Sequence, residues 1–136
     1  MIHHPHAVFD NSAKRYEHLT VRPLAAAMGA EILGANISDI SEQAIEEFRD
    51  ALYRHKMVFL RDQRISHAGH EAFTARIGPF ASDAYTDGME GYEHIQPVIR
   101  QGDDGAAIIF GSGWHFDSPF LPDPPAITIL RGVDIP

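Results

Sequence analysis

The sequence predicts an α+β fold, because helical patterns lie in its first half and strand patterns joined by turns dominate its second half. The chain has 136 residues, a length that fits a single domain. Its hydrophobic fraction of 44% is sufficient for a core. Residues 1–10 are predicted to form a disordered tail, and 11–136 to belong to one folded domain.

Three strands are predicted in the first half of the chain. Residues 19–22 alternate apolar and polar side chains, and residues 30–33 form a short apolar stretch between two glycines. The run Met57-Val58-Phe59-Leu60 is continuously apolar, which is typical of a strand buried on both faces.

A helix is predicted over residues 42–55, with Ser38 or Ser41 as its N-cap. Acidic side chains lie in its first half and basic ones at its end, the order that the helix dipole favours. Apolar side chains recur at helical spacing and predict a buried face. These side chains are Ile45, Phe48 and Leu52.

Near the middle of the chain another helix is predicted, capped by Ser66 and ending near Ile77 before Gly78-Pro79. The acidic, turn-rich stretch 80–93 predicts a mobile loop. Strands are then predicted over 96–100, 107–110 and 126–130, the last after a proline-rich stretch.

The most informative motif is Trp114-His115-Phe116-Asp117. In an extended segment, His115 and Asp117 point to the same side, so an imidazole nitrogen and a carboxylate oxygen can bind one metal ion. A second histidine from elsewhere would complete the two-histidine, one-carboxylate triad of non-haem iron(II) oxygenases. The alternative is a buried histidine at a strand end, beside an aspartate that starts a turn. Trp114 is predicted to point to the opposite face and to pack in the core.

The flanking residues resemble a known family. The Trp-His-x-Asp motif is followed by a small residue, a Phe, prolines and an apolar strand, which is similar to the taurine catabolism dioxygenase family of iron(II)/2-oxoglutarate enzymes. Residues 54–63 resemble the family's early passage from helix to strand, and 73–78 the helix after it. The resemblance extends from about Leu19 to the end of the chain.

The resemblance implies a double-stranded β-helix, or jelly roll, with N-terminal helices packed outside. It implies Fe(II) held by His115 and Asp117, with 2-oxoglutarate as co-substrate in the hydroxylation of a small organic substrate. The family's third ligand, a distal histidine, and its arginine for 2-oxoglutarate are expected after the position of Pro136. The chain is therefore expected to be the N-terminal half of a dioxygenase, with an incomplete jelly roll, two of three metal ligands and no activity alone.

The resemblance also implies a substrate region. Residues 80–95 would form a lid, and Tyr85 and Phe120 would contact the substrate, although Phe120 could instead pack in the core. The stretches 81–85 and 111–113 lack the basic and amide groups that would hold a sulfonate in taurine-using members. The acidic loop would repel an anion, which favours a neutral or cationic substrate.

Composition limits the partners and the location of the chain. The net charge is −8 and basic residues are scattered, which argues against nucleic acid. No cysteine is present, so disulfides, thiolate zinc sites and iron–sulfur clusters are excluded. No apolar run approaches the roughly 20 residues that cross a bilayer, and no secretion signal begins the chain. We therefore expect no membrane partner and a cytoplasmic location.

Two other functional classes stay open. A jelly roll cut in the middle leaves strand edges and apolar faces uncovered, so the chain could be a non-catalytic half-domain that associates with itself or with a partner. A small cupin-like metal binder, completed by the chain's own histidines, is the third class.

Overall fold

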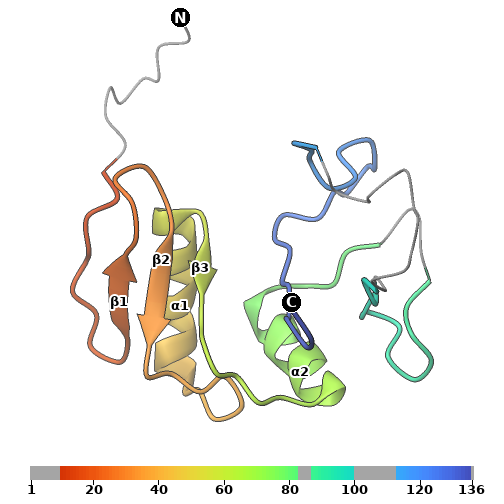
Figure 1. Ribbon diagram of the computed structural model, residues 1–136, viewed down its shortest axis with the longest axis horizontal. Helices are drawn as coiled ribbons and strands as arrows, with labels where there is room; N and C mark the ends of the chain where they lie inside the picture. Colours follow the sequence, from red (N-terminus) through yellow and green to blue (C-terminus); the bar gives the residue numbers. More distant parts are fainter. Residues whose placement is uncertain (1–9, 83–86, 100–112, 136) are drawn as a thin grey trace, which may run out of the picture. The chain divides into compact units, whose positions relative to one another are not determined.

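The structure is a computed structural model that describes residues 10–82, 87–99 and 113–135 (Figure 1). The chain divides into two compact units, Met1–Gly69 and His70–Pro136. Residues 1–9 of the predicted tail lie outside the described residues, so its disorder stays a prediction. No helix in the described ranges is long and apolar enough to cross a membrane.

The first unit contains a three-stranded sheet of order β1-β2-β3, formed by β1 (Thr20–Pro23), β2 (Ala30–Leu33) and β3 (Val58–Phe59). β1 is antiparallel to β2, whereas β2 is parallel to β3. Parallel neighbours need a crossover, which helix α1 (Glu42–His55) provides over one face of the sheet (Figure 1). The predictions for 19–22 and 30–33 are confirmed.

The bounds predicted for the first helix are also confirmed, and Ser41 is its cap. The Ser41 side chain accepts a hydrogen bond from the Ala44 N–H at 3.1 Å, which satisfies one free donor of the first turn. The helix ends where Lys56 takes a left-handed conformation with φ 67°. Its N–H donates to the Leu52 carbonyl at 2.8 Å, which is a common way to terminate a helix.

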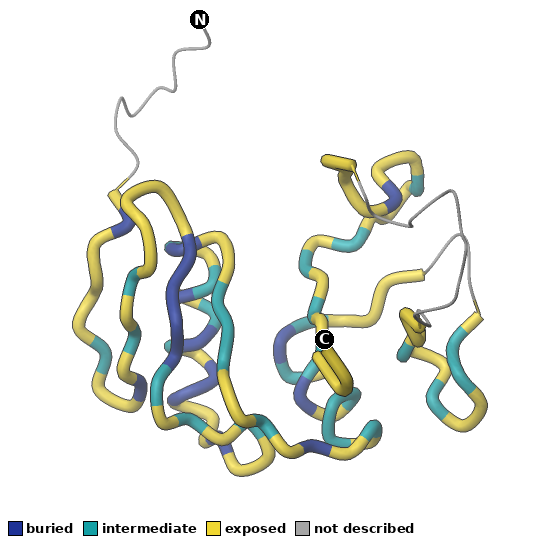
Figure 2. The backbone as a smooth tube through the Cα atoms, in the orientation of Figure 1, coloured by how far each residue is buried: buried dark blue, intermediate teal, exposed yellow. Residues whose placement is uncertain are grey.

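The core of the first unit lies between α1 and the sheet. Ala30 and Ile32 are buried and share one face of β2 by strand alternation (Figure 2). Glu31, on the opposite face, is held by two arginines whose side chains are largely exposed. The face of Glu31 is therefore the one away from the helix. The buried apolar side chains contributed by α1 are Ala44, Ile45, Phe48 and Ala51.

The third strand is shorter and less buried than its apolar run predicts. Only Val58 and Phe59 pair with β2, both are half-buried, and Met57 is exposed. The prediction of a buried strand is wrong, because β3 is only half-buried and α1 covers only one face of this sheet (Figure 1). The Arg61 guanidinium lies 5.1 Å from the centre of the Phe59 ring and covers it instead.

The segment before β1 is bound along α1 by carboxylates one helical turn apart. Glu47 accepts hydrogen bonds from three successive backbone N–H groups, at 2.8 to 2.9 Å. Burial raises the pKa of Glu47, but these donors outweigh it, and the net pKa lies below the ordinary value. Asp50 accepts from the Tyr16 hydroxyl at 2.7 Å and from the Lys14 ammonium at 2.9 Å. The three donors to Glu47 are Glu17, His18 and Leu19.

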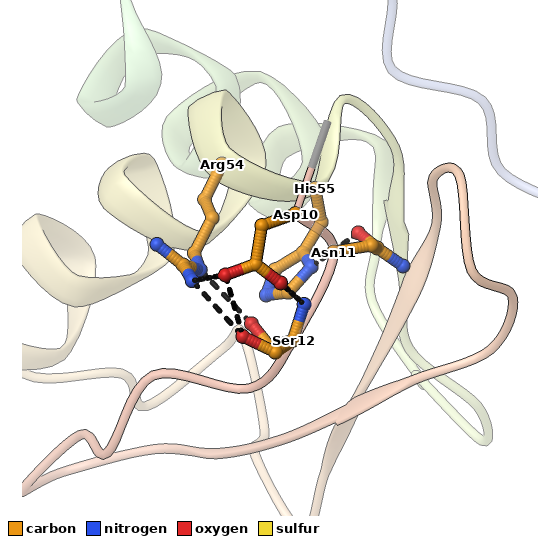
Figure 3. Close-up of polar contacts among 5 residues, drawn as sticks. All are labelled: Asp10, Asn11, Ser12, Arg54 and His55. Atoms are coloured by element: carbon orange, nitrogen blue, oxygen red, sulfur yellow. Dashed lines mark hydrogen bonds and ion pairs between the residues drawn. The ribbon is translucent and has the colours of Figure 1, made fainter. Parts of the chain in front are cut away.

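A buried histidine ends this row of contacts. His55 is completely buried, and its Nδ1 lies 2.7 Å from Asn11 Oδ1, beside the polar cluster of Asp10, Ser12 and Arg54 (Figure 3). The Asn11 amide nitrogen donates to the carbonyls of Ala25 and Gly29, so its oxygen must be the acceptor. His55 Nδ1 therefore carries the hydrogen, and the buried Nε2 has no hydrogen-bond partner among the residues that the structure describes.

The second unit begins within α2 (His67–Ile77). Ser66 accepts from the Gly69 N–H at 3.1 Å, which confirms the predicted cap, and the end near residue 77 is confirmed as well. Residues 89–95 form a hydrogen-bonded turn in which the Met89 N–H donates to the Ile95 carbonyl at 2.9 Å. Glycine is required at Gly88, where a Cβ would lie 2.1 Å from the Glu93 carbonyl oxygen. The mobility of the loop stays a prediction.

The described residues of the second unit form no paired strand. The predictions for 96–99 and 126–130 are wrong in this respect, and 100 and 107–110 lie outside the described residues. Half-buried Ile127 and Ile129 still alternate with exposed neighbours, as in a strand. The local pattern is present, but a strand also needs a hydrogen-bonding neighbour, and no described segment of this unit provides one.

His55 makes the first unit sensitive to mild acid. Burial lowers its pKa below the ordinary value of 6.5; the charge of Arg54 acts in the same direction, and that of Asp50 opposes them. The unfolded chain then binds a proton that the folded chain does not, so we expect the free energy of unfolding to fall as the pH falls below 6.5. Urea unfolding of the full chain at pH 8 to 5 measures this.

The test variant is His55→Gln, and the parent chain is its control. His55→Gln should remove most of the pH dependence between 6.5 and 5, above the range in which carboxylates titrate. A pH dependence that survives His55→Gln would contradict the assignment.

Candidate metal centre

The structure brings His115 and Asp117 together. His115 Nε2 lies 3.3 Å from Asp117 Oδ1, and both side chains are about half exposed, at 52% and 45%. They lie on an irregular extended segment. Their separation suits neighbouring ligands of one metal ion, because metal bonds to imidazole nitrogen and carboxylate oxygen are each about 2.1 Å long.

A backbone hydrogen bond orients the imidazole of His115. Its Nδ1 lies 2.8 Å from the Gly113 carbonyl oxygen, which can only accept, so Nδ1 carries the hydrogen. In the neutral ring, Nε2 then has a free lone pair directed at Asp117 Oδ1. Two acceptors this close repel each other unless a proton or a metal cation lies between them. A proton on Nε2 or a metal cation between the two atoms would relieve this repulsion.

The carboxylate of Asp117 is oriented in the same way. Its Oδ2 accepts a hydrogen bond of 2.5 Å from the Thr128 hydroxyl, so Oδ1 is the oxygen that faces His115. The chain turns immediately after this ligand, because Ser118 has a φ of +44° and its carbonyl accepts from the Leu121 N–H at 3.1 Å. A turn that starts at Asp117 is what the alternative, non-metal interpretation of the motif predicts.

The donor set fits iron(II) in its chemistry, since neutral imidazole and carboxylate are the protein ligands of non-haem iron oxygenases. Two ligands leave most positions of the ion to other groups. Among the described residues, no group of three or more His, Cys, Asp or Glu side chains is arranged to hold a metal. Two other histidines are engaged elsewhere. His55 is buried and hydrogen-bonded to Asn11, and His94 is stacked on Phe80 with ring centres 3.9 Å apart.

The aromatic residues around the pair differ from prediction. Trp114 is fully exposed, so its prediction as a core residue is wrong in this structure: the extended segment carries its side chain into solvent, and no described element covers it. Phe116 is also exposed, and Phe120 is 62% exposed, so neither core packing nor a closed pocket wall is formed at Phe120. Tyr85 lies outside the described residues.

Sequence reasoning missed Thr128 and the Gly113 carbonyl. In the sequence, Thr128 lies within an apolar strand pattern, in the run Ile127-Thr128-Ile129. The signal that could have identified it is this single hydroxyl on the exposed side of a strand-like pattern, shortly after a proposed ligand. Its contact with Asp117 spans 11 residues and depends on the path of the intervening chain.

A second polar cluster lies in the first unit. The buried Glu31 carboxylate is bonded to Arg22 and lies 2.9 Å from the Arg61 Nε. The Arg22 hydrogen bond, followed by that of Arg61, lowers the pKa of Glu31 against the effect of burial. A groove of about 510 Å³ adjoins it, lined by residues 31–36 and 61–64. The acidic and basic side chains that line the groove balance in charge, so the groove favours neither an anionic nor a cationic ligand.

Comparison with known proteins identifies the family of the chain. Residues 20–136 match the family model described as "Taurine catabolism dioxygenase TauD, TfdA family". The chain belongs to this family. The match begins at the first residue of β1 and includes the His115–Asp117 pair, as the motif predicts.

Curated members of the family are longer. The chain is 31% identical over 120 residues to the alpha-ketoglutarate-dependent sulfate ester dioxygenase of Pseudomonas putida, covering 87% of this chain and 38% of that one. It is 30% identical over 122 residues to an alkylsulfatase of Acinetobacter baylyi, covering 88% and 37%. The chain thus spans less than two-fifths of the length of these family members.

The similarity to a solved structure supports the family assignment. A taurine dioxygenase from Burkholderia xenovorans is 30% identical, with a TM-score of 0.51 over 57% of this chain and 28% of that chain. The coverage fits the N-terminal part of a family member.

We predict that metal binding requires His115 and Asp117 together. Titration calorimetry with cobalt(II), after deletion of the histidine-containing residues 1–6, should show binding that either alanine substitution abolishes, because one remaining ligand cannot hold the ion. His18→Ala, a substitution in the first unit, should leave binding unchanged. Equal binding by both site variants and the parent chain would refute the site.

Proposed function

We propose that the chain forms the N-terminal, metal-holding part of an iron(II)- and 2-oxoglutarate-dependent dioxygenase that hydroxylates a small organic substrate. The observation that carries the proposal is the 3.3 Å approach of His115 Nε2 to Asp117 Oδ1, with the other heteroatom of each side chain hydrogen-bonded elsewhere. Family membership and the names of the curated relatives support the reaction type.

In such a reaction, the residues of this chain would position the metal ion. His115 and Asp117 would hold the ion from one side and leave its other side for substrate and co-substrate. When bound, iron(II) supplies the redox chemistry that couples decarboxylation of 2-oxoglutarate to hydroxylation of a C–H bond. The exposure of both ligands leaves the open side accessible.

The remaining groups are proposed to come from a part of the fold outside residues 1–136. These are a distal histidine as third ligand and an arginine that pairs with the far carboxylate of 2-oxoglutarate. The jelly roll would be completed by the same part. The coverage of 37% to 38% of the curated relatives supports this division. The cytoplasmic location stays a prediction.

For the substrate we propose a sulfate ester. Two relatives of about 30% identity carry names that refer to this chemistry, an alkylsulfatase and a sulfate ester dioxygenase. Hydroxylation of the carbon bearing the ester oxygen would give a product that releases sulfate. The acidic side chains Asp87, Glu90 and Glu93 count against this proposal because they would repel an anion, so a neutral alkyl compound is the comparison substrate in the assay.

The second candidate function is association as a non-catalytic half-domain. It is favoured by the large apolar side chains that the second unit exposes, most of them at more than 70% of their surface. Contiguous exposed apolar patches larger than a few hundred Å² are uncommon on monomeric proteins. The side chains are Val98, Ile99, Trp114, Phe116, Phe120, Leu130, Val133 and Ile135.

We predict no 2-oxoglutarate turnover by the 136-residue chain, because the distal histidine and the arginine of the site are proposed to lie outside it. Succinate formation with iron(II) should equal the no-protein control. A chimera that continues into the corresponding C-terminal part of the Pseudomonas putida relative should form succinate and release sulfate from an alkyl sulfate. His115→Ala in the chimera should abolish both activities. Turnover by the short chain would contradict the proposed division of the site.

We also predict that the isolated chain self-associates. At about 25 cal/mol per Å², leaving about 400 Å² of apolar surface uncovered forgoes on the order of 10 kcal/mol, which is comparable to the stability of a domain. Sedimentation velocity should show a dimer or larger species that becomes smaller on dilution. A concentration-independent 15.1 kDa monomer with a sharp melt would exclude this candidate.

A further inference from the structure

The carboxylate of Asp117 has two oxygens with different surroundings. Oδ1 lies 3.3 Å from His115 Nε2, whereas Oδ2 accepts the Thr128 hydroxyl at 2.5 Å. A carboxylate rotates easily about its terminal torsion, because that torsion is broad and roughly two-fold. An aspartate on an exposed segment would therefore present either oxygen, or both, to a metal ion. The hydrogen bond from Thr128 removes this freedom.

The position of Thr128 does not depend on Asp117 alone. Its neighbours Ile127 and Ile129 are half-buried, while Thr128 itself is exposed, so the alternation of the extended segment directs its hydroxyl away from them. Two prolines, Pro124 and Pro125, stiffen the chain shortly before it. The segment that carries Thr128 therefore positions the hydroxyl independently of its hydrogen bond to Asp117.

We propose that Thr128 is a positioning residue that makes Asp117 a one-oxygen metal ligand. With Oδ2 occupied by the hydroxyl, binding through both oxygens is disfavoured, and one more position of the ion stays open for a co-substrate or substrate. The Gly113 carbonyl has the equivalent role for His115, through Nδ1. This inference rests on the proposed function, because it concerns the same metal site.

Outer hydrogen bonds of this kind typically change metal affinity by about 10- to 100-fold when they are removed. Thr128→Val keeps the shape of the side chain and removes the hydroxyl, whereas Thr128→Ser keeps the hydroxyl. Thr20→Val, an exposed threonine in β1, is the matched control. The test uses cobalt(II) with the chain lacking residues 1–6, and follows affinity by calorimetry and ligand geometry by the visible absorption spectrum of the bound ion.

We expect Thr128→Val to weaken cobalt(II) binding by about 10-fold or more and to change the visible spectrum, since binding through two oxygens raises the coordination number. Thr128→Ser and Thr20→Val should retain the parent affinity and spectrum. Thr128→Ala serves as a second variant if circular dichroism shows that the valine variant is misfolded.

The outcomes separate the two proposals. If His115→Ala and Asp117→Ala abolish binding while Thr128→Val and Thr128→Ala retain the parent affinity and spectrum, Thr128 has no positioning role but the metal site stands. If neither ligand substitution affects binding, the metal site itself is refuted, and the role of Thr128 with it.

Discussion

The first unit depends on the burial of one face of α1 against the sheet. Ile45 and Phe48 provide most of the apolar volume of this face, and burying a side chain of this size contributes about 1.5 to 3 kcal/mol. Once the helix is fixed, an adjoining side of it presents Glu47 and Asp50 to the segment before β1. The same orientation buries His55, where Asn11 anchors the beginning of that segment.

The candidate metal centre is organised differently, because it lies on an irregular segment without a strand ladder. Its geometry depends on two outer hydrogen bonds, from His115 to the Gly113 carbonyl and from Thr128 to Asp117. Each bond occupies one heteroatom of a proposed ligand, and the remaining heteroatoms, Nε2 and Oδ1, face each other. A site built this way keeps its ligand atoms together even though both side chains are about half exposed.

Prediction from the sequence succeeded where local interactions decide the structure. The caps at Ser41 and Ser66, and the bounds of α1, follow from side chains within one helical turn of the ends. It failed for β3 and for residues 126–130, because the burial and pairing of a strand depend on neighbours that are distant in sequence. It also placed Trp114 in a core, since a large aromatic side chain is usually buried, and the structure exposes it.

The sequence by itself determined the helices, their caps and the two-residue spacing that directs His115 and Asp117 to one side, because each is a property of a few consecutive residues. Only the tertiary structure decided which oxygen of Asp117 faces His115, and which histidine is buried without a partner for Nε2 among the described residues. Thr128 reaches Asp117 across 11 residues, and Asn11 reaches His55 across 44. Contacts of this range form only when the folded chain brings the two segments together, so no local pattern encodes them.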